Sequence, residues 1–328
     1  MIAIAIVTSI IHPPHGPDYL TWTLTRFIFA ILCFKDLRNI NPIKFAKVAS
    51  WLSPLIVFPH YVITNPFSYG EYRYSGFYGD PNFLSLALNL IIILCFIASV
   101  KSKNTLLKFF CITSIIGSVP LILLGMSRGG VLGLIVILAF IMTSIWKKSK
   151  KISILLILTL IGYSGTFIAK FDTTLTMIEN RFSGDSTQDV NGAKARVEGI
   201  ESVINVMSNC PELIPVGIGL GNTAANISTY RPYGYYCKYV VHNTFFSLFY
   251  EAGIVMLILY ISIYIYILKR LWRYKNYLLI GLLLSGTLSL MTLPGVCFMP
   301  AWIMLFFLAN KQIQETSISQ QSNSLQNN

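Results

Sequence analysis

Charged side chains are scarce in this chain: 12% of its residues are charged, whereas 54% are hydrophobic. A soluble globular core cannot take up so much apolar side chain, so the composition predicts a protein whose solvent is the lipid bilayer. The net charge of +12 does not by itself indicate nucleic acid, because basic residues in membrane proteins mark the cytoplasmic loops. We therefore expect the bilayer, and no nucleic acid, as a partner.

Several functional motifs are missing as well. The chain has no Gly-x-x-x-x-Gly-Lys phosphate loop, which excludes ATP-driven transport within it. It has no Asp-x-Asp pair, which disfavours a glycosyltransferase that holds a nucleotide sugar through a metal. The histidines lack metal-ligand spacing, so we predict neither a metal nor a cofactor. Ionisable residues are nearly absent from the middle of the apolar runs, which argues against an ion-coupled transporter.

The apolar runs predict an all-α, polytopic membrane protein with about ten transmembrane helices. We expect one transmembrane domain over residues 1–310 and a disordered cytoplasmic tail over 311–328, which is rich in Gln, Ser and Asn. The first run lacks the basic start and small-residue cleavage site of a signal peptide. The expected helices cover residues 1–11, 20–34, 48–63, 83–100, 109–125, 131–146, 152–169, 244–268, 277–292 and 296–309.

The basic residues predict the topology. Of the 25 Lys and Arg residues, 16 lie at Lys311 and in the links 35–47, 101–108, 147–151 and 269–275. Placing these links in the cytoplasm satisfies the positive-inside rule at every turn and puts both termini inside. The opposite, outer side of the membrane then carries segments 12–19 and 64–82, the Gly125–Gly130 turn, and one large loop over about 170–243.

The large loop contains a candidate amphipathic helix. Apolar residues recur at helical spacing opposite Glu198 and Glu201, and Pro211 ends the pattern; these apolar residues are Val197, Ile200, Val203, Ile204 and Met207. We expect this helix to lie on the membrane surface, where it can act as a lid. The same loop holds Cys210 and Cys237, for which a disulfide and two free thiols remain open.

Arginines dominate the outer basic residues, and their planar guanidinium suits phosphate oxygens. Arg128 lies in a glycine-rich turn where a ligand can approach the backbone, so it is a candidate diphosphate clamp; contact with a lipid headgroup is the alternative. Arg73 belongs to the segment before the span at 83–100. There Asp80 or Asn82 can cap a helix whose free N–H groups face an anion, or can cap it without binding a ligand.

His242 and Asn243 precede the span that begins near residue 244, and Glu251 follows two turns further in. A histidine there can accept a proton near neutral pH, although a lone interfacial histidine is ordinarily structural. The glycine run 217–221 has no βαβ unit around it and is not a dinucleotide site. It is expected to bring backbone close to a ligand or the membrane surface, or to be a plain loop.

In their order along the chain, these segments resemble the O-antigen polymerase and O-antigen ligase superfamily of bacterial inner-membrane enzymes. The resemblance covers roughly residues 70–310. It rests on the Gly-Asp-Pro-Asn start at 79–82, Ser-Arg-Gly-Gly at 127–130, Asn-Arg-Phe at 180–182, Ala-Lys-Ala-Arg at 193–196, Pro-Val-Gly-Ile-Gly at 215–219, and His242-Asn243 followed by Gly253.

The resemblance implies a metal-independent glycosyltransferase whose donor is an oligosaccharide linked to undecaprenyl diphosphate. By position, Arg128, Arg181 and Arg196 match the outer arginines of the superfamily and would neutralise the leaving diphosphate. His242 matches its loop histidine and would orient or deprotonate the attacking hydroxyl. We take His242, Arg128 and Arg196 as the catalytic candidates. The candidates for substrate binding are Arg181, Arg73, Asp80, Asn82, Asn243 and Glu251.

Three activities are weighed. An O-antigen polymerase joins lipid-linked repeat units on the periplasmic face, and a chain-length regulator is then a further candidate partner. An O-antigen ligase transfers the glycan to lipid A core. Met256 stands where the ligase pattern has Gly, Thr or Tyr, which favours the polymerase. A flippase of lipid-linked sugars needs cationic groups along a central cavity, and the chain offers almost none.

Overall fold

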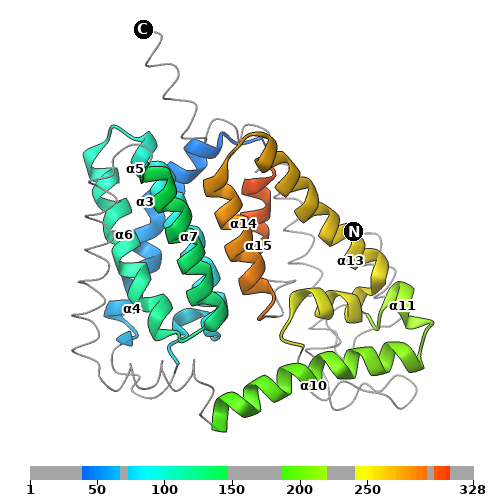
Figure 1. Cartoon of the computed structure of the whole chain (residues 1–328). Helices are drawn as coiled ribbons and strands as arrows, with labels where there is room; N and C mark the ends of the chain where they lie inside the picture. Colours follow the sequence, from blue (N-terminus) through cyan, green and yellow to red (C-terminus); the bar gives the residue numbers. More distant parts are fainter. Residues whose placement is uncertain (1–38, 67–72, 147–186, 220–240, 294–298, 311–328) are drawn as a thin grey trace. The chain divides into compact units, whose positions relative to one another are not determined.

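The computed structural model of the chain describes residues 39–66, 73–146, 187–219, 241–293 and 299–310 (Figure 1). Throughout these ranges the regular structure is helical and contains no strand, which confirms the all-α prediction for this part of the chain. The chain divides into two compact units. The bundle unit comprises Asn39–Asp185, Leu268–Ser289 and Phe307–Asn328, and the loop unit comprises Met1–Arg38, Ser186–Ile267 and Leu290–Phe306.

Helix α5 (Pro81–Lys101) is the centre of the bundle unit. It packs against α3 (Pro42–Val57), α6 (Thr105–Leu124) and α7 (Arg128–Trp146) (Figure 1). Its sequence is apolar around the whole circumference, and 17 of its 21 residues are buried. A helix that is apolar on all sides belongs inside a bundle. The apolar run alone therefore explains why this helix occupies the core.

The outer surface of α6 is apolar as well. Leu106, Phe109, Ile112 and Ile116 recur at helical spacing and are each more than half exposed. A stripe of this kind is unfavourable in water and is typical of a lipid-facing side. Together with the apolar composition, it marks this unit as membrane-embedded.

Three described helices are long and apolar enough to cross a membrane: α5, α6 and α13 (Thr244–Arg273). Shorter apolar helices are α7 and α14 (Tyr277–Leu290). Each matches a predicted span, and α15 (Met299–Leu308) falls on the last of them. The predicted spans 1–11, 20–34 and 152–169 and the tail 311–328 lie outside the described residues, so the count of about ten stays a prediction.

The predicted span 48–63 consists of two helices rather than one. Helix α3 ends at Val57, and the four-residue helix α4 (Pro59–Val62) follows after Phe58. Pro59 lacks the N–H that would continue the hydrogen-bonding of the preceding turn, which explains the division. The described residues continue to 66 after α4 and resume at Arg73. The 3-10 helix η2 (Gly76–Tyr78) then leads into α5.

In the loop unit, the predicted amphipathic helix is α10 (Thr187–Asn209), which ends shortly before Pro211 as expected. Part of its predicted apolar side packs within the protein, because Val203 and Met207 are buried in a protein core. Val197 and Ile204 are 55% and 51% exposed. The short helix α11 (Leu213–Val216) follows α10.

Candidate functional site

Two helix N-termini of the bundle unit are joined by side-chain hydrogen bonds. Asp80 caps α5, and its Oδ1 accepts hydrogen bonds from the backbone N (2.6 Å) and the side-chain Nδ2 (2.9 Å) of Asn82. The Oδ1 of Asn82 in turn accepts a 2.5 Å hydrogen bond from the Ser127 hydroxyl. That hydroxyl also accepts from the backbone N of Gly130 at 3.0 Å, so Ser127 caps α7. The starts of α5 and α7 therefore lie side by side.

The two N-termini differ in charge. The N-cap of α5 is Asp80, whose carboxylate accepts a hydrogen bond from the backbone N of Asn82. Helix α7 has an uncharged serine cap and begins with Arg128, a half-buried side chain. Both the helix dipole and the guanidinium favour an anion at this second terminus. The start of α7 therefore combines a helix N-terminus with a cation, a pairing that suits an anion.

Arg73 belongs to the same end of the bundle unit. Its Nε donates to the carbonyl oxygen of Gly125 at 3.3 Å, three residues before Arg128. The backbone N of Tyr74 donates to the carbonyl oxygen of Leu124 at 3.1 Å. The segment that carries Arg73 is thus fixed to the turn that leads into α7, and both arginines gather there.

The turn between α6 and α7 is shorter than the predicted Gly125–Gly130 segment, because the helix begins at Arg128. Its left-handed residue is Met126, with φ of 47°, rather than a glycine. A Cβ added to Gly130 would lie 2.3 Å from the Ser85 side chain of α5. This glycine therefore allows close helix packing, and does not line a ligand site as its motif suggested.

In the loop unit, His242 lies directly before the cap of α13. Asn243 Oδ1 accepts from the backbone N atoms of Phe245 (3.0 Å) and Phe246 (3.2 Å). The hydroxyl of Thr244, which is fully buried, donates to the carbonyl oxygen of Leu293 at 2.6 Å. On the other side of His242, Val241 is buried. These neighbours fix the backbone of His242. Its side chain is half-buried, so part of it reaches the surface.

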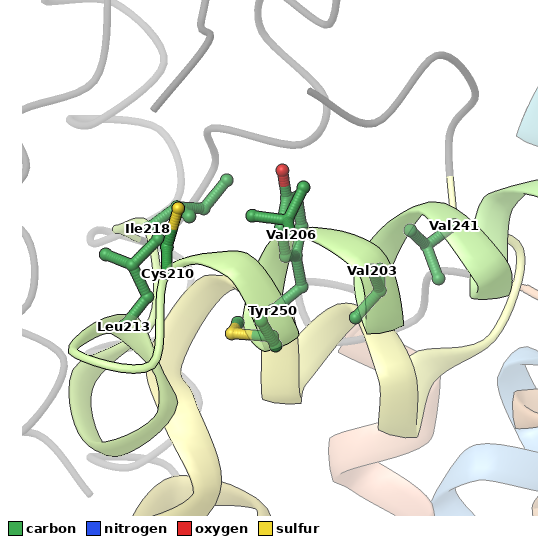
Figure 2. Close-up of a cluster of buried hydrophobic side chains, with 8 residues drawn as sticks. Val203, Val206, Cys210, Leu213, Ile218, Val241 and Tyr250 are labelled. Carbon is green, nitrogen blue, oxygen red and sulfur yellow. The ribbon is translucent and has the colours of Figure 1, made fainter. Parts of the chain in front are cut away.

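A small hydrophobic core packs next to the start of α13 (Figure 2). It contains buried side chains from α10, from the segment after it, from the residues just before α13 and from α13 itself: Val203, Val206, Met207, Cys210, Leu213, Ile218, Val241 and Tyr250. Burial of this much apolar surface joins the end of α10 to the first turns of α13. Arg196 lies two turns before Val203 on α10, although its side chain is outside the described residues.

Cys210 is a free, buried thiol within this core. Burial, and in second place the nearby Glu212 carboxylate, raise the pKa of Cys210 above its ordinary value. A neutral buried thiol is a poor nucleophile. Its possible partner Cys237 lies outside the described residues.

The described part of the glycine run, residues 217–219, packs against the backbone of α13. Helix α13 is broken at Gly253, where φ is 78° and ψ is 177°. The carbonyl oxygens of Tyr250 and Glu251 accept hydrogen bonds from the backbone N atoms of Ile218 and Gly219, both at 2.9 Å. A Cβ on Gly253 would lie 2.2 Å from the Pro215 carbonyl oxygen, and one on Gly217 would lie 2.5 Å from the Ala252 nitrogen. Residues 215–219 and the helix break at Gly253 therefore pack directly against each other. We call this contact the interlock.

This interlock positions Glu251, whose side chain is 6% exposed. Of the nine predicted site residues, the bundle unit thus brings together Arg73, Asp80, Asn82 and Arg128, and the loop unit contains Arg196, His242, Asn243 and Glu251. Arg181 lies outside the described residues. Sequence reasoning missed Ser127, whose place immediately before the apolar run of α7 is a cap signal. In the described ranges, no group of three or more His, Cys, Asp or Glu side chains is arranged to hold a metal ion.

The fold and the apolar helices define a helical membrane protein. Residues 112–261 match the O-antigen ligase family model, which confirms the resemblance to the O-antigen polymerase and ligase superfamily. The match includes Arg128, Arg181, Arg196, His242, Asn243 and Glu251. Searches of curated proteins and of solved structures found no match.

Proposed function

We propose that this protein is an O-antigen polymerase, or a polymerase of a related surface polysaccharide. It joins repeat units carried on undecaprenyl diphosphate at the periplasmic face of the bacterial inner membrane. The O-antigen ligase match supports a glycosyltransferase-like enzyme of this superfamily in general. The observation that carries the proposal is the pair of linked helix N-termini beside Arg73 and Arg128.

This arrangement suits the charge that develops in the reaction. A hydroxyl of the acceptor sugar attacks the anomeric carbon of the donor, and the bond from that carbon to the diphosphate oxygen breaks. The leaving diphosphate takes the electron pair and gains negative charge, which preorganised arginines and helix N–H groups stabilise without a metal. Arg128 is the central contact in this proposal, with Arg73, Arg181 and Arg196 as further cationic contacts.

His242 is the proposed general base. Its ring accepts the proton that the acceptor hydroxyl loses as the new glycosidic bond forms. Asn243 and the small core fix the backbone on either side of it, which preorganises the ring. Glu251, Asp80 and Asn82 are proposed to contact sugar hydroxyls, the last two in addition to their roles in helix capping.

The ligase reaction is the second candidate, because it uses the same donor and the same leaving group. The difference lies in the acceptor, which is lipid A core in the ligase. Met256 follows the helix break at Gly253 and is fully buried, where the ligase pattern has Gly, Thr or Tyr. This favours the polymerase. A flippase is the least favoured alternative.

The test is deletion of the gene in its native host, followed by electrophoresis of the lipopolysaccharide. We expect core that carries a single repeat unit, with long chains restored by the wild-type gene. Bare core with polymer accumulating on its lipid carrier would identify a ligase instead. Bare core without that polymer would favour the flippase, and unchanged lipopolysaccharide would contradict all three.

A further inference from the structure

A buried histidine holds the segment that leads to the proposed diphosphate site. His60 of α4 is 1% exposed and the Tyr74 side chain is 0% exposed, although both belong to an irregular end of the bundle unit. The ring Nδ1 of His60 lies 2.5 Å from the Tyr74 hydroxyl oxygen. That oxygen lies 2.6 Å from Thr64 Oγ1. Two buried side chains and the half-buried Thr64 therefore form one chain of hydrogen bonds.

The hydrogen bonds assign the protons. The Thr64 hydroxyl donates to the carbonyl oxygen of His60 at 2.7 Å, so its oxygen accepts from the Tyr74 hydroxyl. The Tyr74 oxygen is then the acceptor for a proton on His60 Nδ1. His60 thus acts as a donor that fixes Tyr74. Removing the Tyr74 hydroxyl takes this acceptor away from the buried His60 Nδ1, and removing the His60 ring takes a donor away from the buried Tyr74 hydroxyl.

The chain wraps closely around this ring. Gly76 has φ of 53°, and a Cβ there would lie 2.3 Å from His60 Nδ1. The ring of Phe77 lies 4.8 Å from the His60 ring between centroids, and the ring of Tyr78 stacks on it at 6.2 Å. Only a glycine lets the backbone pass here. The whole stretch 74–78 is therefore shaped around His60.

The other end of this segment reaches the site. Tyr74 is bound through its backbone N to Leu124 and through its side chain to His60, and Arg73 binds the Gly125 carbonyl oxygen. The segment thus bridges α4 to the turn before Arg128. We propose that His60 is a positioning residue: through Tyr74 it holds Arg73 and the start of α5 in the arrangement that binds the lipid-linked diphosphate. This inference rests on the proposed function.

The test compares Tyr74→Phe, His60→Leu and His60→Asn, in which the asparagine amide replaces the Nδ1 donor. The matched control is Ser53→Ala, which removes a buried 2.7 Å hydrogen bond between α3 and α6 away from this segment. Each variant is purified in detergent, and kcat and KM are measured with a lipid-diphosphate-linked repeat unit. Hydrogen exchange of residues 73–80 is followed by mass spectrometry.

We expect Tyr74→Phe and His60→Leu to lower kcat/KM by about 10-fold or more and to speed exchange over 73–80. We expect His60→Asn to stay within about threefold of wild type, and Ser53→Ala to leave both readouts unchanged. His60→Leu combined with Arg73→Ala should cost less than the product of the two single losses, because the two changes act in part through Arg73.

Wild-type kinetics in Tyr74→Phe would overturn the inference, as would an equal loss in Ser53→Ala, which would mean a merely structural effect. Failure of the proposed function is distinguishable, since it appears as unchanged lipopolysaccharide after gene deletion. In that case the exchange rates still decide whether His60 holds the segment.

Discussion

At the scale of single residues, the two charged side chains at the helix starts, Asp80 and Arg128, have opposite effects on an anion. Asp80 places a negative charge at the start of α5, and Arg128 places a positive charge at the start of α7. Asn82 and Ser127 connect the two, so an anion at α7 lies beside a fixed network. We therefore expect Arg128 to contribute more to the proposed site than the other arginines do.

The first prediction follows from this asymmetry. Arg128→Ala should lower glycan extension by about 100-fold or more, because it removes a preorganised charge where the leaving diphosphate gains charge. Arg128→Lys should retain part of the activity, since lysine keeps the charge and loses the planar fork. Both are measured as glycan length and yield in the deletion host, with membrane levels checked by immunoblot. The control is Lys103→Ala, an exposed cation in the α5–α6 link; unchanged product in Arg128→Ala would remove Arg128 from the site.

At the scale of elements, sequence patterns predicted helices well where packing is local. The apolar runs predicted α5, α6, α13 and α14, and the helical spacing before Pro211 predicted α10. They did not predict that part of the apolar side of α10, including Val203 and Met207, packs into a protein core. The partners of Val203 come from α13 and the segment before it, far along the chain.

The break in α13 was also not predictable from periodicity. The apolar run continues on both sides of Gly253, so nothing in the spacing marks it. The break exists because residues 215–219 pack against the helix and bind its carbonyl groups. Likewise, the hydrogen bond from His60 to Tyr74 joins two ordinary-looking aromatic residues, and only the fold brings them into contact. Long-range contacts account for both.

The interlock between residues 215–219 and Gly253 gives a prediction for helix α13. Gly253→Ala should destabilise the protein by at least about 3 kcal/mol, because alanine is strained at this φ and ψ and its Cβ would meet the Pro215 carbonyl. Gly79→Ala is the matched control: its φ is 70°, yet a Cβ there meets nothing within 4 Å. It should show only the left-handed penalty of about 1–2 kcal/mol. Melting temperatures in detergent measure the difference, and equal losses would mean that the contact with Pro215 contributes nothing.

At the scale of the whole molecule, the helix ends that carry arginine and the links that are rich in lysine are predicted to lie on opposite sides of the membrane. The start of α5 carries the network of Asp80 and Asn82, while its end carries Lys101 and leads to the link with Lys103; Lys108 follows in the first turn of α6. Helix α5 is long and apolar enough to cross a membrane, and a crossing helix has its two ends on opposite sides. For such a crossing, the positive-inside rule predicts that the lysine end is cytoplasmic and that Arg128 lies outside.

Reporter fusions test this orientation. Alkaline phosphatase fused after Gly79 should be active and the same enzyme fused after Lys103 inactive, because phosphatase folds with its disulfides only in the oxidising periplasm. The two fusions differ by α5 alone, so their contrast reports the direction of that helix, and blots for both fusion proteins control for expression. The reverse pattern would put Asp80, Asn82 and Arg128 in the cytoplasm. A periplasmic polymerisation site at the start of α7 would then be untenable, whatever the phenotype of the deletion strain.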